Sequence, residues 1–328
     1  MGCPSLWISG TLQDSPRSTR LGWFRFNAPM SVLVVGSIAL DHIKTPVAEH
    51  RHLLGGSASY AAVAASFFGP VQLVGVIGND FPPAHTELFK SRKIDLEGLE
   101  VADGETFAWT GEYELNMNNR RTLSVALNVF EHFAPKLPEN YRDTPYVLLG
   151  NIAPSLQQSV RRQVRNPKFV VADTMDLWIG MARADLVELI KEVDMLILND
   201  SEARQLTEED NLIRAGRMIA EMGPRYVAVK KGEHGCLLFG RKGEFFSTGA
   251  FPLDAIKDPT GAGDCFAGGV IGHLARTDDT SFANLKEAII QGTLVASFCV
   301  EEFSLRRLEK LVAGEIESRR EAFGSYIA

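Results

Sequence analysis

Short continuous apolar runs alternate along the chain with amphipathic stretches. The runs are rich in Val, Ile and Leu and are apolar at consecutive positions, which is typical of strands buried on both faces. Stretches with helical spacing of apolar residues lie between them. The repeated order of strand then helix predicts an α/β domain, with a parallel sheet covered by helices on both faces. The predicted strands cover residues 32–38, 71–78, 146–152, 169–174, 194–200 and 226–232, and the helices 57–69, 84–94, 155–164, 183–193 and 211–223.

One region has a different pattern. Residues 101–130 contain alternating segments around an Asn-Met-Asn-Asn-Arg turn, which predicts an antiparallel hairpin with one solvated face. Residues 42–56 also read as extended. We expect the two segments to form a small β-sheet flap, and such flaps often close over a substrate. The alternative is an edge extension that packs against another subunit.

The first 29 residues do not resemble the rest of the chain. They contain no sustained apolar core of a signal peptide, and Leu6 stands where a myristoylation signal requires Ser or Thr. We expect residues 1–29 to form an extension without fixed structure. Met30 directly precedes the first strand, so translation that begins there is an equally good interpretation.

Composition narrows the class of protein. The chain has 328 residues, of which 45% are hydrophobic, so it can bury a large core. Its net charge of -7 and the absence of a basic block disfavour binding to nucleic acid or an anionic membrane. The four cysteines have neither zinc-site nor disulfide-scaffold spacing, which fits a reducing cytoplasm. No apolar run approaches the roughly 20 residues of a membrane span.

The stretch Asp-Pro-Thr-Gly-Ala-Gly-Asp at residues 258–264 leads into a small-residue helix. Gly261 and Gly263 permit a tight turn whose amides, together with the helix dipole, favour an anion such as phosphate. Asp264 would repel that anion if it served only as a cap. We therefore interpret Asp264 as a general base that accepts the proton of an attacking hydroxyl. A helix cap without a ligand is the alternative.

Other phosphate and hydrolase motifs do not occur in the sequence. No Gly is followed by Lys, which excludes a Walker A loop, and Phe266 stands where a dinucleotide fingerprint requires Gly or Ala. The GxSxG and HExxH motifs are also absent.

Five ordered pieces of the sequence resemble the ribokinase-like (PfkB) carbohydrate kinases. They are DPTGAGDCFAGG at 258–269, LLGGSASYAAVAASFFG at 53–69, VVGSIALDH at 34–42, LNDSEARQLT at 198–207 and VKKGEHGCLLF at 229–239. The resemblance covers nearly everything after Met30. It implies one kinase domain over residues 30–328, a ribokinase-like three-layer sandwich with a mostly parallel central sheet and a small β-sheet lid built from about 42–56 and 101–130.

The resemblance also implies roles for individual residues. Asp264 would be the catalytic base, and the amides of Gly261, Ala262 and Gly263 would form the anion hole. Asn199 and Glu202 would face the nucleotide phosphates and hold Mg²⁺, directly or through water. The alternative is that Asn199 is a plain helix cap and Glu202 a surface acid. The remaining implied roles are Lys230 and Gly232 for the nucleotide, Asp41, Gly55 and Gly56 for substrate hydroxyls, and Asp258 and Thr260 for a monovalent cation such as K⁺.

Some positions depart from the family pattern or extend it. Tyr60 stands where related sugar kinases often have Asn, so it either contacts a substrate base or packs in the core. Asn151 and Asp173 end buried strands at the edge where ligands of open α/β sheets gather, so either is a candidate substrate contact. Arg120 or Arg121 at the flap turn could reach a phosphate or acidic group on the substrate, although an exposed basic turn is the simpler interpretation.

Together these features predict a cytoplasmic, ATP- and Mg²⁺-dependent kinase that phosphorylates a hydroxyl, primary in our interpretation, of a sugar or sugar derivative. A nucleoside kinase of the same family is the main alternative. A non-catalytic sensor is disfavoured by Asp264, and a hydroxymethyl-pyrimidine kinase is disfavoured by the flap. The lid also makes a homodimer a candidate arrangement.

Overall fold

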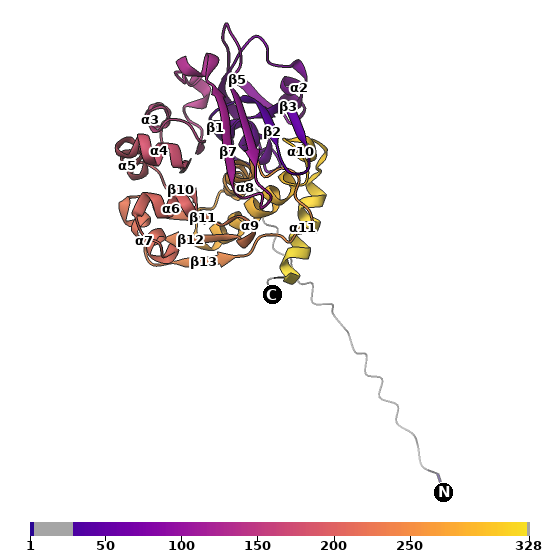
Figure 1. Cartoon of the computed structure of the whole chain (residues 1–328). Helices are drawn as coiled ribbons and strands as arrows, with labels where there is room; N and C mark the ends of the chain where they lie inside the picture. Colours follow the sequence, from indigo (N-terminus) through magenta and orange to yellow (C-terminus); the bar gives the residue numbers. More distant parts are fainter. Residues whose placement is uncertain (3–28, 327–328) are drawn as a thin grey trace.

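The computed structural model describes residues 1–2 and 29–326. The extension expected over residues 1–29 therefore falls almost entirely outside the described residues. The body of the protein is built on a nine-stranded sheet in the order β13-β12-β11-β10-β9-β8-β1-β4-β5 (Figure 1). Its parallel strands are β1 Val32–Val35, β4 Val71–Ile77, β5 Ile94–Val101, β8 Tyr146–Leu149, β9 Phe169–Asp173, β10 Met195–Asn199 and β11 Tyr226–Lys230; β12 Cys236–Gly240 and β13 Phe245–Thr248 are antiparallel.

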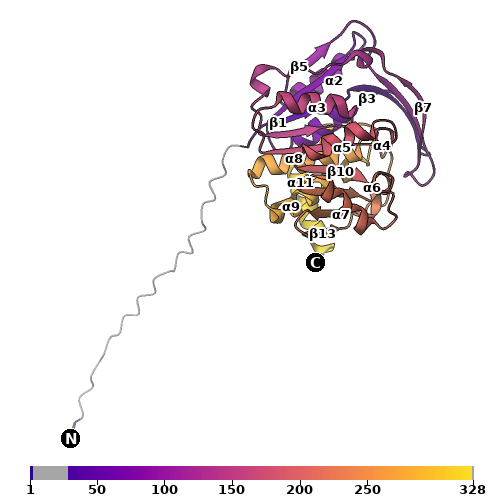
Figure 2. The same cartoon turned by 90° about the vertical axis from the view of Figure 1, so that its left-hand side faces the viewer.

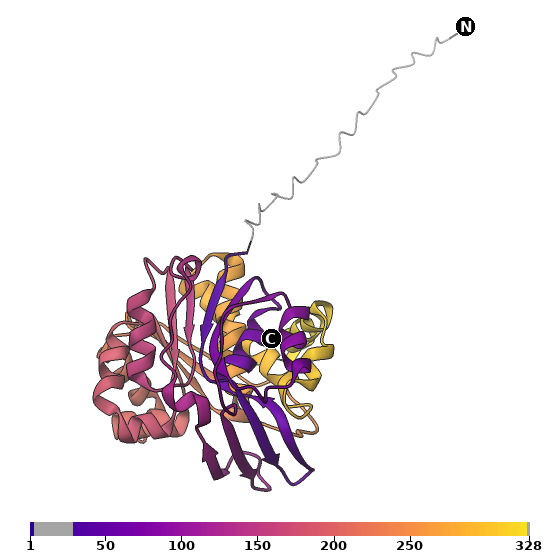
Figure 3. The same ribbon diagram turned by 90° about the horizontal axis from the view of Figure 1, so that it is seen from above.

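The main sheet is buried on both faces, as the continuous apolar runs predicted. In β1, Val32 and Val34 belong to one core, whereas the alternate residues Leu33 and Val35 belong to the other. Figure 3 shows helices on both sides of the sheet. The first core contains helices α1 Ser57–Ala65, α8 Ala262–Thr277 and α9 Phe282–Cys299, and the second contains α3 Pro154–Gln163, α5 Arg183–Lys191, α6 Asp200–Thr207 and α7 Leu212–Met222. The three-layer α/β prediction is confirmed.

Two glycines of α8 allow its neighbours to approach closely. A Cβ on Gly268 would lie 2.3 Å from the carbonyl oxygen of Ala61 in α1, and a Cβ on Gly269 would lie 2.8 Å from the Cα of Gly292 in α9. These glycines therefore serve helix packing. The turn before α8 also needs a glycine, for a different reason that is given with the site below.

A four-stranded sheet of order β3-β2-β6-β7 forms the lid. Its strands are β2 Ala39–Lys44, β3 Glu49–Gly55, β6 Ala108–Tyr113 and β7 Arg120–Ala126. The predicted small β-sheet is thus present, although Val101 ends β5 in the main sheet and the lid begins at Ala39. In Figure 2 the lid strands curve along one side of the body, and their tip hangs beside α4 and α6.

The remaining helices complete the described chain. They are α2 Pro83–Ser91, α4 Asp176–Met181, α10 Arg306–Lys310, α11 Ala313–Tyr326 and 3-10 helices at Asn128–His132, Glu139–Tyr141 and Gly232–His234. None of the helices within residues 29–326 is long and apolar enough to cross a membrane.

Candidate active site

The glycine-rich turn ahead of α8 has a conformation that requires glycine at its last residue. Gly261 has φ +77°, and a Cβ there would lie 2.3 Å from the ring of Tyr60. Of the amides of Gly261, Ala262 and Gly263, only that of Ala262 donates to an acceptor in the described chain, the Pro259 carbonyl at 3.3 Å. The other two amides remain available to an anion at the positive end of the helix.

Tyr60 forms the floor of this turn. Its side chain is 1% exposed and packs in the core of α1 and α8. Of the two interpretations of Tyr60, the structure places it in the core, with its ring against Gly261. Its hydroxyl has no hydrogen-bond partner within the described residues.

Asp264 lies in the first turn of α8, partly buried. Burial, reinforced by the negative charge of Asp173, raises the pKa of Asp264 to about 7, while the positive charges of Lys230 and Arg120 oppose this rise. A carboxyl group with this pKa can accept a proton near neutral pH, as a general base must.

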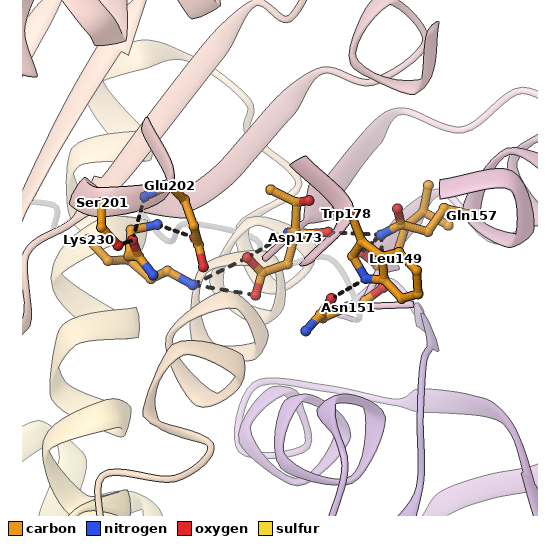
Figure 4. A network of polar contacts seen from close by, with 11 residues as sticks. Leu149, Asn151, Gln157, Asp173, Trp178, Ser201, Glu202 and Lys230 are labelled. Carbon is orange, nitrogen blue, oxygen red and sulfur yellow. Dashed lines mark hydrogen bonds and ion pairs between the residues drawn. The ribbon is translucent and has the colours of Figure 1, made fainter. Parts of the chain in front are cut away.

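Lys230 ends β11, and its ammonium lies beside the anion-hole turn. Its Nζ is 3.2 Å from Oδ1 of Asp173 and would lie 2.9 Å from a Cβ on Gly263. Burial opposes the charge of Lys230, but the carboxylates of Asp173, Glu202 and Asp264 outweigh it and raise the pKa of Lys230. Figure 4 shows the ammonium between the carboxylates of Glu202 and Asp173. Lys230 therefore carries a fixed positive charge at the turn.

Asn199 and Glu202 form a capping box at the start of α6. The Glu202 amide donates to Oδ1 of Asn199 at 2.8 Å, and the Asn199 amide donates to Oε2 of Glu202 at 2.7 Å. Ser201 Oγ also donates to Oδ1 of Asn199. Glu202 is only 5% exposed, so it is not a surface acid, and burial raises its pKa to about 7.

Asp41 lies at the lid side of the site. It is 4% exposed, and burial together with the charges of Asp258 and Asp264 raises its pKa well above its usual range. A Cβ on Gly55 would lie 1.9 Å from the Asp41 carboxylate, and one on Gly56, where φ is +89°, would lie 2.4 Å from the Ser37 carbonyl. The glycine pair thus makes room for the Asp41 carboxylate and for the entry into α1.

Asn151 is held by a tryptophan that the sequence did not single out. The indole Nε1 of Trp178, in α4, donates to Oδ1 of Asn151 at 2.9 Å. This bond leaves the Asn151 amide nitrogen pointing away from Trp178 (Figure 4). The sequence analysis also did not identify Gln157, which is buried. Its Nε2 donates to the carbonyls of Leu149, Gly150 and Asp173 at the ends of β8 and β9.

Asp258 is fully buried and bonds to backbone amides. Its Oδ1 accepts from the Thr260 amide at 2.9 Å and its Oδ2 from the Ser304 amide at 3.1 Å. Burial raises the pKa of Asp258, against these hydrogen bonds. The Thr260 hydroxyl donates to the Tyr113 hydroxyl of the lid at 3.1 Å. The described residues contain no group of three or more His, Cys, Asp or Glu side chains that could hold a metal.

The lid tip reaches the opposite side of the site. Asn118 Nδ2 donates to both carboxylate oxygens of Glu233, at 3.1 and 3.2 Å, next to Gly232. Arg121 bonds to Glu112 within the lid, whereas Arg120 lies 3.8 Å from Asp176 of α4. The predicted site residues therefore come together from the lid, the strand ends of the main sheet and the start of α8.

Comparison with known proteins identifies the family. Residues 30–310 match the pfkB family of carbohydrate kinases. The chain belongs to this family. It is accordingly a sugar or nucleoside kinase, a phosphotransferase with an alcohol group as acceptor.

Three similar proteins illustrate this relationship. A cytidine kinase of Thermococcus kodakarensis is 28% identical over 75% of this chain and 89% of its own length. Burkholderia thailandensis nucleoside kinase in complex with inosine has a TM-score of 0.72 and 19% identity over 90% of this chain and 99% of that one. An E. coli protein of the ribokinase II type, with ATP and Mg²⁺, has a TM-score of 0.72 and 18% identity over 89% and 99% of the two chains.

Proposed function

We propose that this kinase transfers the γ-phosphoryl group of ATP to a primary hydroxyl of a sugar or nucleoside, with Asp264 as general base. One observation carries the proposal. The carboxyl group of Asp264, with a pKa of about 7, lies in the same helix turn as two amides that have no acceptor among the described residues, next to the charged Lys230. A base and an anion site thus stand side by side, as phosphoryl transfer to an alcohol requires.

The proposed step is an in-line displacement. The acceptor oxygen forms a bond to the γ-phosphorus while the bond from this phosphorus to the β–γ bridging oxygen breaks, and ADP leaves with the electron pair. The Asp264 carboxylate takes the proton of the acceptor hydroxyl. The amides of Gly261 and Gly263 and the ammonium of Lys230 stabilise the charge on the phosphoryl oxygens.

The residues at the start of α6 fit Mg²⁺ held through water. Oε2 of Glu202 and Oδ1 of Asn199 serve the capping box, which leaves Oε1 of the buried Glu202 without a hydrogen bond in the described chain. Mg²⁺ usually keeps several waters and uses one or two carboxylates. Bound there, it would neutralise charge on the phosphates.

A monovalent cation such as K⁺ is proposed at Asp258 and Thr260. The Asp258 carboxylate is fully buried and bonds only to amides, so its negative charge lacks a paired cation within the described residues. Replacing Na⁺ by K⁺ in the assay should raise activity if a cation fills this role, and equal activity in both salts would contradict it.

The acceptor is proposed to lie between the lid and the main sheet. Asp41 and the Gly55-Gly56 backbone would bind hydroxyls, and the amide nitrogen of Asn151 would donate to one. The similarity to the cytidine kinase favours a nucleoside acceptor, because the aligned region covers most of both chains. Tyr60 would not contribute base stacking, because its ring is buried beneath Gly261.

A lid-mediated homodimer and a cytoplasmic location complete the proposal. The edge strand β7 and the residue after it expose Leu123, Val125 and Leu127 along one face, a pattern suited to a second lid. Cys236, Cys265 and Cys299 are free and buried, which suits a reducing compartment. Sedimentation of the wild-type chain and a Leu123→Glu variant would test the dimer, because the charge should release monomers.

The test of the function is ADP release from Mg-ATP across free sugars, sugar phosphates and nucleosides. Acceptor-dependent release supports the kinase and selects the acceptor class. ATP binding without release for any acceptor would favour the sensor instead. The Asp264→Asn variant separates true turnover from contaminating activity.

A further inference from the structure

Two neighbouring arginines of β7 have opposite surroundings. The Arg121 guanidinium bonds to Oε2 of Glu112 at 2.5 Å and is 72% exposed. Glu112 also pairs with Lys44 on the same outer surface. Because successive strand residues point to opposite faces, Arg120 faces the other way. Its direction is toward the body of the protein, since its nearest ion-pair partner is Asp176 of α4.

The Arg120 guanidinium keeps its donors available. Its Nη2 lies 3.8 Å from Oδ1 of Asp176, which is too long for a hydrogen bond, and Asp176 is itself exposed. No hydrogen bond of the Arg120 side chain occurs within residues 29–326. The positive charge of Arg120 also opposes the rise in pKa of Asp264, so the guanidinium lies within electrostatic reach of that carboxyl group.

The lid tip fixes the strand that carries Arg120. The Asn118 amide bonds to the Glu233 carboxylate, and Asn118 Oδ1 would lie 3.4 Å from a Cβ on Gly232. Arg120 follows two residues later. This contact joins the lid tip to the turn that follows β11, whose last residue is Lys230, so Arg120 lies on the side of the site where Lys230 lies.

Acidic side chains outnumber the ammonium of Lys230 at the site. The carboxylates of Asp173, Glu202 and Asp264 surround the ammonium of Lys230, which pairs with Asp173 at 3.2 Å. The nucleotide adds further negative charge at the same place. A guanidinium can bind two phosphoryl oxygens at once and is already oriented by the strand.

We propose that Arg120 is a catalytic residue that binds the non-bridging oxygens of the transferring phosphoryl group when the lid is closed. The inference rests on the proposed function and deepens it. Arg120 would remain bound while the acceptor oxygen bonds to phosphorus, the bond to the bridging oxygen of ADP breaks and Asp264 takes the proton. Asp176 would hold the guanidinium near the site before the nucleotide binds.

The test compares three full-length variants with the wild type: Arg120→Gln, Arg120→Lys and the matched control Arg121→Gln. With saturating Mg-ATP and the acceptor found above, Arg120→Gln should lower kcat by about 10²–10³-fold, as loss of a charge-stabilising donor does. The acceptor KM should change little. Arg120→Lys should recover part of kcat, and Arg121→Gln should match the wild type.

Two results would overturn the inference. One is an Arg120→Gln variant that turns over as fast as Arg121→Gln. The other is a loss confined to acceptor KM, which would mean that Arg120 binds an acidic group of the acceptor. Failure of the proposed function looks different, because the wild type itself would then release no ADP with any acceptor.

A binding experiment tests Arg120 even in that case. Calorimetry with Mg²⁺ and either ADP or a non-hydrolysable ATP analogue measures how much the γ-phosphate adds to affinity. Arg120→Gln should weaken binding of the analogue about tenfold or more, as loss of a charge-assisted hydrogen bond does, and leave ADP affinity unchanged. An unchanged ratio of the two affinities would contradict the assignment.

Discussion

The ammonium of Lys230 lies 3.2 Å from the Asp173 carboxylate, and the two residues end β11 and β9, the strands on either side of β10 in the main sheet. The side chains are largely buried, with exposed fractions of 18% and 6%. Asp173 holds the ammonium over Gly263, at the start of α8. The pair therefore fixes the position of one positive charge at the proposed phosphate site.

Removing this charge should shift the pH dependence of turnover. Lys230 opposes the rise in pKa of Asp264, so Lys230→Met should raise that pKa further. The rising limb of kcat against pH should then move to higher pH, in addition to a loss of kcat. Lys242→Met, at an exposed position, provides the control. If the rising limb of kcat for Lys230→Met stays at the same pH as in the wild type, the charge of Lys230 does not influence the pKa of Asp264.

Asp264→Asn should stabilise the fold at neutral pH. The folded-state pKa of Asp264 is about 7 and its usual value is 3.8, so between these values the folded state binds more protons than the unfolded state. The free energy of unfolding therefore falls as pH rises through this window. Asn does not ionise, so the Asp264→Asn variant avoids this fall in the free energy of unfolding. Its Tm should therefore exceed that of the wild type by roughly 2 °C or more at pH 8, and by less at pH 5.

The control for this measurement is Asp254→Asn, because Asp254 is exposed. Its Tm should follow the wild type at both pH values. A lower Tm for Asp264→Asn at pH 8 would contradict the idea that burial strains this carboxylate.

Trp178→Phe should weaken acceptor binding while leaving ATP binding unchanged. The substitution removes the indole donor that fixes Oδ1 of Asn151 and keeps most of the ring. Loss of one such bond corresponds to about a 2–10-fold higher acceptor KM. Leu177→Ala, at an exposed neighbouring position of α4, should have no effect. An equal rise in the KM for ATP would place Trp178 outside the acceptor site.

Gly261→Ala should cost stability and turnover together. An L-residue at φ +77° costs about 1–2 kcal/mol, and the added methyl group would overlap the Tyr60 ring, for about 1–3 kcal/mol more. Gly243 is a matched control, because its φ is +93° but no described residue beyond its two chain neighbours lies within 4 Å of its Cβ position. Denaturant unfolding of Gly261→Ala and Gly243→Ala should therefore show the larger loss in the free energy of unfolding for Gly261→Ala. Equal losses would show that the Tyr60 ring does not contribute to the cost.

Much of the sheet could be predicted because its central strands are buried on both faces. The apolar runs at β1, β4 and β8 to β11 have no other simple interpretation. The strand β5 was not predicted, since it is an edge strand with alternating polar residues and follows directly after a helical pattern. The pair β12 and β13 is antiparallel and departs from the strand-helix rhythm.

The parts of the site that lie in one short sequence motif could be predicted. The contacts between side chains far apart in the sequence could not. Asp264 and its turn are contiguous, and the two residues of the capping box, Asn199 and Glu202, are three positions apart. The Trp178–Asn151 bond joins residues 27 apart and the Lys230–Asp173 pair joins residues 57 apart. Strand alternation places Arg120 and Arg121 on opposite faces, but only the folded lid decides which one faces the site.

The most direct test of the central claim is the pH dependence of kcat for acceptor-dependent ADP release, measured for the wild type and Asp264→Asn. The wild type should gain activity as pH rises through about 7, because Asp264 must be deprotonated to accept the acceptor proton. Asp264→Asn should retain ATP binding, lose kcat by about 10²–10⁴-fold and lack this limb. A variant with near-normal kcat and an unchanged limb would show that Asp264 is not the base.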